Sequence, residues 1–185
     1  MKKISFFQIV YSLIENNLEQ LTGVDKQVLI RLLGGQNNHL TPSGGYPITI
    51  DHDQPIALLI QNCHFSNTDL DIFCGYNLWP NKNGIENVKI FVIRFDKVLN
   101  AHEVSDELDR LGLRPANLKE ILAFSLINPD IQRNNLIVGL GSTLLNSKNV
   151  ICVPYLSGNV AQRKLSLTPW DHNWQTHWQF AAVEL

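Results

Sequence analysis

The chain is poor in charged residues, which occupy 17% of its 185 positions. A typical globular protein carries about 25%. Fifteen basic and seventeen acidic side chains leave a formal net charge of −2 at pH 7. Dedicated nucleic-acid binders usually carry a basic footprint. The balance therefore disfavours nucleic acid as the partner, although it leaves room for a local basic patch.

Long apolar runs are also missing, and none approaches the ~20 residues that a membrane-spanning helix needs. The N-terminus has the outline of a secretory signal, because Lys2 and Lys3 precede an apolar stretch. Gln8 and Ser12 interrupt that stretch, however, and no small-residue cleavage site follows it. Polar residues recur there at helical spacing, which predicts an amphipathic helix with a wide apolar face. We therefore expect no membrane partner.

Cysteine occurs at only three positions, Cys63, Cys74 and Cys152. An odd number without repeating spacing argues against a disulfide framework. Cys74 and Cys152 lie in apolar runs, where a free cysteine behaves as a small buried hydrophobe. We expect three free thiols and a cytoplasmic location.

Sequence motifs for cofactors, metals or catalysis are absent or incomplete. Residues 139–143, GLGST, lack the lysine of a phosphate-binding loop and the spacing of a dinucleotide fingerprint, so we interpret them as a tight turn. Asp51, His52 and Asp53 suit a turn in which they bond the local backbone. Cys63 and His64 would point to opposite faces of a strand. We therefore predict no cofactor, no metal site and no catalytic residue.

Glycine, proline and asparagine divide the chain into short elements. Two helices are predicted over residues 5–21 and 25–33, each followed by glycine, and residues 36–46 form a loop. Asn117 and Glu120 have the spacing of a capping box. Further helices are predicted over 101–111 and 117–126, and strands over 47–50, 55–61, 87–95, 135–140, 150–156, 163–167 and 178–184.

These elements predict an α+β fold. An N-terminal helical hairpin (1–35) would precede an α+β body (47–185), as two domains or as a single one. Short connections between the last strands favour a mainly antiparallel sheet arranged as a meander. The first two strands, over 47–50 and 55–61, would form a hairpin with residues 51–54 at its tip.

The second half of the chain carries a family resemblance. GLRPANLKEILAF is followed by Pro129 and Gln132, then by IVGLGS, and the chain closes with FAAVEL behind a tryptophan. Over residues 96–185 this arrangement resembles a group of small bacterial proteins to which no activity is assigned. In that group a similar capped helix precedes an apolar strand and an aromatic-rich last strand. The resemblance implies a bacterial or mobile-element origin and implies no functional residue.

Aromatic and imidazole side chains are concentrated near the C-terminus, where three of the four tryptophans lie. Such a density is typical of an interface or a ligand platform, and also of a core cap. The candidate binding residues are Trp170, Asp171, His172, Trp174 and His177. Trp178, beside FAAVEL, is expected in the core, and Trp170 is expected to be the most exposed of the three.

The sequence therefore predicts a non-enzymatic binding protein that acts through protein contacts. The first alternative is a small hydrolase or transferase that uses His172 or His177 with a cysteine or aspartate. The second is a DNA-binding regulator that uses the N-terminal helices. The helix over 25–33 offers only Lys26 and Arg31 as basic groups, fewer than a recognition helix normally presents.

Overall fold

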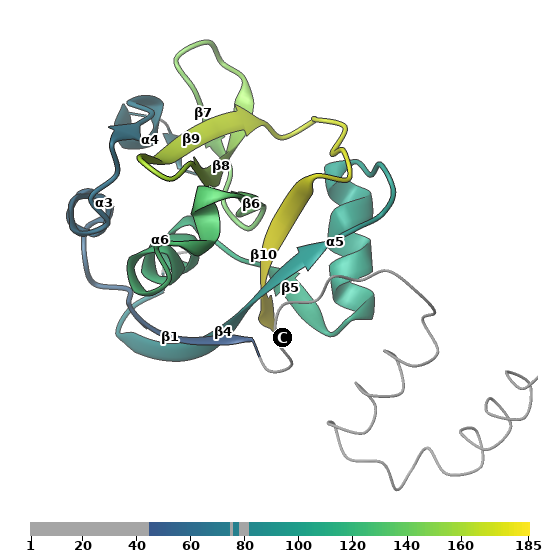
Figure 1. The fold of residues 1–185 in the computed structure, drawn as a ribbon, viewed down its shortest axis with the longest axis horizontal. Helices are drawn as coiled ribbons and strands as arrows, with labels where there is room; N and C mark the ends of the chain where they lie inside the picture. Colours follow the sequence, from purple (N-terminus) through teal and green to yellow (C-terminus); the bar gives the residue numbers. More distant parts are fainter. Residues whose placement is uncertain (1–44, 75, 78–81) are drawn as a thin grey trace, which may run out of the picture. The chain divides into compact units, whose positions relative to one another are not determined.

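The computed structural model describes residues 45–74, 76–77 and 82–185, which all belong to a compact unit spanning Asn38–Leu185 (Figure 1). The helical hairpin predicted over residues 1–35, and with it the proposed DNA-binding element, lies outside the described residues. Among the helices of the described part, none is long and apolar enough to cross a membrane.

Short helices alternate with strands along the described chain, which confirms the α+β class. The helices are α3 (Ile56–Asn62), α4 (Asp71–Cys74), α5 (Ala101–Arg110) and α6 (Leu118–Ile127), with a 3₁₀ turn, η2 (Ile131–Arg133). The strands are β1 (Tyr46–Asp51), β2 (Asn67–Thr68), β3 (Tyr76–Asn77), β4 (Ile85–Arg94), β5 (Leu113–Pro115), β6 (Leu136–Val138), β7 (Leu144–Leu145), β8 (Ile151–Gly158), β9 (Arg163–Pro169) and β10 (Trp178–Glu184).

The described strands form one mixed sheet, in the order β1-β4-β10-β6-β8-β7-β3. In addition, β5 pairs with β10, and β9 pairs with β8 and β2. Strand β10 runs parallel to β6, and β2 runs parallel to β9. The prediction of a mainly antiparallel meander is therefore wrong, because β10 leaves its sequence neighbour β9 and lies between β4 and β6.

The composition of β10 explains its central position. Ala181 and Val183 belong to one core cluster, whereas Phe180 and Ala182 belong to the other. A strand that is apolar on both faces is most stable when both faces are covered. Strand β4 shares this character, and the two strands pair in antiparallel register with Phe180 opposite Ile93.

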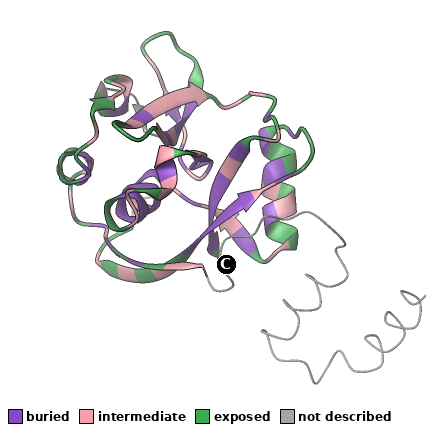
Figure 2. Cartoon of the chain, viewed as in Figure 1, coloured by how far each residue is buried: buried purple, intermediate pink, exposed green. Residues whose placement is uncertain are grey.

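Helices α6 and α5 pack against the sheet in two different core clusters, and they differ in how much of their surface is buried. Helix α6 lies in the first core cluster and buries most of its side chains, as the purple ribbon in Figure 2 shows. Helix α5 belongs to the second cluster and buries only one side, formed by Ala101, Val104 and Leu108.

The capping box predicted for α6 is confirmed. The side chain of Asn117 accepts from the Glu120 N–H at 3.0 Å, and the Glu120 carboxylate accepts from the Asn117 N–H at 2.7 Å. Glu120 is fully buried and also receives the guanidinium of Arg114 at 2.6 Å. The same box occurs at α5, where Asn100 and Glu103 exchange the equivalent bonds.

The strands predicted over 47–50, 87–95, 150–156, 163–167 and 178–184 are confirmed as β1, β4, β8, β9 and β10. The strand predicted over 55–61 is wrong, since this segment forms helix α3. A short apolar run fits a strand or a buried helix equally well by periodicity. Pro55 disfavours a paired strand, because it has no backbone N–H, and it is the extended N-cap residue that directly precedes α3, with φ of −61° and ψ of 140°.

Candidate functional site at the open edge of strand β1

Strand β1 ends the sheet and pairs only with β4 among the described strands. Its side chains alternate, so that Ile48 and Ile50 are buried in the core that holds α6. Pro47 and Thr49 are exposed on the other face. A strand with one partner presents a row of open backbone N–H and C=O groups along its free side. Strand β1 therefore offers both a backbone edge and a side-chain surface.

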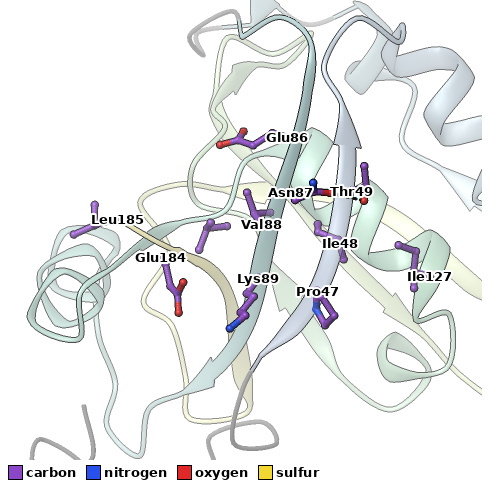
Figure 3. A pocket seen from close by; sticks show the side chains of 11 residues that line it. Pro47, Ile48, Thr49, Glu86, Asn87, Val88, Lys89, Ile127, Glu184 and Leu185 are labelled. Carbon is purple, nitrogen blue, oxygen red and sulfur yellow. Dashed lines mark hydrogen bonds between the residues drawn. The ribbon is translucent and has the colours of Figure 1, made fainter. Parts of the chain in front are cut away.

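Two hollows adjoin β1, and they share Thr49 and Ile127 in their linings. The larger has a volume of about 660 Å³ and the smaller about 240 Å³. Figure 3 shows the side chains of the larger hollow, which are Pro47, Ile48, Thr49, Glu86, Asn87, Val88, Lys89, Ile127, Val183, Glu184 and Leu185. The smaller is lined by Thr49, Ile50, Asp51, Gln54, Leu59, Ile85, Ala123, Leu126 and Ile127.

The end of α6 adds exposed apolar surface beside this edge. Leu126 is 44% exposed and Ile127 is 55% exposed, and both line the smaller hollow. Adjacent exposed apolar side chains at a concave surface are typical of an interaction site. We call the free side of β1, together with Leu126 and Ile127, the β1 edge surface.

Charged groups near the β1 edge surface are largely engaged by neighbours. Asp51 accepts from the Asp53 N–H at 3.0 Å and from the Gln54 side-chain amide at 3.2 Å. The predicted turn at residues 51–54 is thus confirmed as local backbone bonding. Glu86 is hydrogen-bonded by Lys82 at 2.9 Å and by His52 at 2.9 Å. These two contacts, that of Lys82 first, lower the pKa of the Glu86 carboxyl.

Residues 170–178, which contain three tryptophans, lie in another part of the molecule, where they lead into β10 and contact the N-terminal part of α5. Trp174 is 1% exposed and Trp178 is 9% exposed, and their rings meet edge to face at 5.2 Å between centroids. Trp170 is only half-buried and meets the ring of His102 at 4.7 Å. The tryptophans therefore follow the predicted order, with Trp178 in the core and Trp170 the most exposed.

The remaining predicted binding residues lie around this buried pair. Asp171 and His177 are exposed, and His172 is half-buried against both Trp174 and Trp178. We call the group His102, Trp170, Asp171, His172, Trp174, His177 and Trp178 the aromatic corner. In the described part of the chain, no hydrogen bond joins these imidazoles to a carboxylate or thiol, so the residues gather without forming a proton-transfer pair.

The two cysteines with described side chains, Cys63 and Cys152, are free and buried, and burial disfavours their thiolates. Burial raises the pKa of the Cys63 thiol to about 11. Burial, and then the carboxylate of Asp69, raise the pKa of Cys152. The reactive species of a cysteine is its thiolate, which a raised pKa makes scarce at neutral pH. Cys63 is the C-cap residue directly after α3 and does not lie in a strand, so the predicted strand arrangement of Cys63 and His64 is wrong.

The GLGST segment has a structural role at the start of α6. The Ser142 hydroxyl accepts from the Leu118 N–H at 2.8 Å, and the Gly141 N–H donates to Ala116 at 2.9 Å. A Cβ on Gly141 would lie 2.5 Å from the carbonyl oxygen of Pro115, so only glycine fits. Among the described residues, no group of three His, Cys, Asp or Glu side chains is placed to hold a metal ion.

The sequence did not predict the β1 edge surface, because the strand expected over residues 55–61 would have paired with β1. Because this segment forms helix α3, β1 pairs with β4 alone among the described strands. The signal that would have revealed it is Pro55, placed directly before the apolar run.

No protein-family model matches the chain, and no curated protein or solved structure shows significant similarity to it.

Proposed function

We propose that this chain is a non-enzymatic binding protein that acts through protein contacts, and that the β1 edge surface is its main contact region. The observation that carries this proposal is the sheet edge at β1, which pairs with β4 alone among the described strands, beside two exposed apolar side chains, Leu126 and Ile127, at the end of a buried helix. Open strand edges pair readily with another polypeptide, and apolar side chains beside them add buried area.

The chemistry of the described residues favours binding over a hydrolase or transferase. The pKa values of Cys63 and Cys152 are raised, which works against nucleophilic attack. His172 packs on tryptophan rings, and no described carboxylate or thiol orients it. The free, buried thiols of Cys63 and Cys152 support the proposal that the protein is located in the cytoplasm. The resemblance to small bacterial proteins supports the proposal of a bacterial origin.

The aromatic corner is the second candidate contact region. Trp170, Asp171, His172 and His177 remain accessible, while the buried Trp174 and Trp178 support them from below. Tryptophan that is rigidly held at a surface is a frequent interface anchor. We propose that these residues contribute contacts in addition to those of β1.

Site-specific photo-crosslinking in cells tests the proposed function. A photoreactive amino acid replaces Ile127 in one protein and Val160 in a matched control, because Val160 is 87% exposed on the β8–β9 turn. We expect discrete protein adducts from position 127, including adducts to the chain itself, and none from position 160. The same adduct pattern from both positions would contradict a role for the β1 edge surface. The same probe at Trp170 tests the aromatic corner.

A further inference from the structure

We propose that the β1 edge surface binds a second copy of this chain, through antiparallel pairing of the two β1 strands about a twofold axis at Thr49. The proposal rests on the proposed function and names the partner.

The hydrogen-bond pattern of β1 shows which residues face its free side. The His52 N–H donates to the Gly84 carbonyl at 2.9 Å, in the same register that pairs Asp51 with Ile85. Residues of an antiparallel strand alternate between bonding the partner strand and facing away. Ile48 and Ile50 therefore bond to β4. Pro47, Thr49 and Asp51 direct their backbone groups to the open side.

These open groups are self-complementary when Thr49 lies opposite Thr49 of the second copy. The two threonines exchange two N–H···O=C bonds across the axis. In the next hydrogen-bonded pair, two residues along each strand, the Asp51 N–H of each copy donates to the Pro47 carbonyl of the other. Pro47 has no N–H to return. The Asp51 carbonyl that would need it already accepts from the Gln54 N–H at 3.3 Å. No backbone group between Pro47 and Asp51 is left unpaired.

Side chains agree with this arrangement on both faces. A twofold axis perpendicular to the sheet keeps the α6 side of one copy on the α6 side of the other. Ile48 then lies opposite Ile50 of the second copy, and the exposed Leu126 and Ile127 of both copies lie on that same side. The two Thr49 side chains meet on the opposite, exposed face, where the Thr49 hydroxyl donates to the Asn87 side-chain oxygen at 2.7 Å.

Charge also permits the strand to pair with itself. Residues 46–50 carry no charge. Asp51 would face Pro47, and its carboxylate is already hydrogen-bonded by Asp53 and Gln54. Natural edge strands that avoid pairing usually carry lysine or another charge at the edge. Strand β1 has two such devices, Pro47 and the terminal Asp51, and the twofold pairing places them opposite each other at the two ends of the strand pair.

The test measures the mass of the full-length chain by analytical ultracentrifugation over a concentration series up to about 1 mM. We expect the wild type to reach twice the chain mass. Thr49→Lys and Thr49→Glu should each stay at the chain mass, because like charges directly opposite each other in a strand pair repel. Mixing the two variants should restore the doubled mass, since the axis places lysine opposite glutamate.

Val160→Lys is the matched control, because it adds the same charge at an exposed turn. It should associate like the wild type. If Thr49→Lys fails to fold by circular dichroism, Ile127→Lys replaces it, since a 55% exposed side chain tolerates lysine in the monomer. A wild type at the chain mass throughout, a dimer unaffected by these changes, or no recovery on mixing would each overturn the proposal. Edge-specific crosslinks to another protein, with a monomeric wild type, would overturn the self-pairing and leave the proposed function standing.

Discussion

Arg163 joins three parts of the chain that are far apart in sequence. Its guanidinium donates to the Cys63 carbonyl at 2.9 Å and to the Ser125 carbonyl and hydroxyl at 2.6 Å. It also lies over the ring of Phe65 at 5.3 Å. Among the described side chains no carboxylate forms an ion pair with it, and burial lowers the pKa of the guanidinium. The cation therefore holds α3, α6 and β9 together through carbonyl oxygens.

Replacing Arg163 by methionine should lower the free energy of unfolding by about 2–3 kcal/mol, because buried acceptors would lose charge-assisted hydrogen bonds. Arg163→Lys should recover only part of this loss, since an ammonium cannot reach Cys63 and Ser125 in the same planar geometry. Urea denaturation of the three proteins measures both values. Equal stability of the wild type and the methionine variant would show that the network does not hold the helices in place.

Cys63 should resist alkylation in the folded protein. Because its pKa is about 11, the thiolate is scarce at pH 8, and burial blocks access as well. We expect iodoacetamide to label Cys63 rapidly in denaturant and at least ~100-fold more slowly under native conditions, as peptide mass spectrometry would show. Rapid native labelling of Cys63 would reopen the cysteine-enzyme alternative.

Among the elements, α6 depends on its N-terminal cap. Asn117→Ala should cost about 1 kcal/mol by leaving the Glu120 N–H without its acceptor. Asn100→Ala at α5 is the matched comparison, because it removes the same bond from an exposed helix start. We expect the change at α6 to cost more, since its first turn is part-buried. Chemical denaturation of both variants provides the comparison. An unchanged midpoint for Asn117→Ala would mean that the box does not stabilise α6.

The segment that leads into β10 should separate structural tryptophans from accessible ones. Trp174→Ala and Trp178→Ala should each cost about 3–5 kcal/mol, the range for removing a large buried aromatic. Trp170→Ala should cost less, because Trp170 is half-buried and packs mainly on His102. Thermal melting of the three variants gives the order. If Trp170→Ala is the most destabilising of the three, Trp170 is mainly a structural residue, which would contradict its proposed role as an accessible contact residue of the aromatic corner.

Elements were predictable from sequence where their signal is local. The capping residues Asn117 and Glu120 and the β-branched run of β4 both act within a few positions of the chain, so their predictions are confirmed. Helix α3 was missed, since the periodicity of a short apolar run suits either structure and the local signal against a strand was the single residue Pro55 in front of it. The position of β10 between β4 and β6 depends on which distant strands cover its two faces, and short connections alone suggested β9.

At the scale of the whole molecule, the candidate site arises from topology rather than from any motif. Leu126 and Ile127 looked like the end of an ordinary core helix, and Thr49 like one residue of a hairpin. They become a surface only because β1 lies at the end of the sheet order and α3 does not pair with it. The aromatic corner was visible in sequence because tryptophan and histidine are rare, but burial of Trp174 depends on the bridge that joins it to Leu99.

The stability of the whole domain should fall in acid partly through Glu86 and Glu107. Lys82 and then His52 lower the pKa of Glu86, and Lys97 lowers the pKa of Glu107. A carboxyl whose pKa is lower in the folded state stabilises that state above its unfolded pKa, here near the ordinary value of 4.5. This stabilisation is lost as the pH falls through the folded pKa, because both states are then protonated.

Glu86→Gln combined with Glu107→Gln should therefore lower the free energy of unfolding by about 1 kcal/mol at neutral pH, since both pairs are solvent-accessible. The difference between wild type and double variant should shrink below about pH 4.5 and vanish once the pH has fallen below the lowered folded pKa values, where glutamine mimics the protonated acid. Denaturation curves at a series of pH values measure this difference, and salt should reduce it at neutral pH because the pairs are screened. A difference that grows as the pH falls would have the opposite sign and would mean that these carboxyls are held neutral in the folded domain.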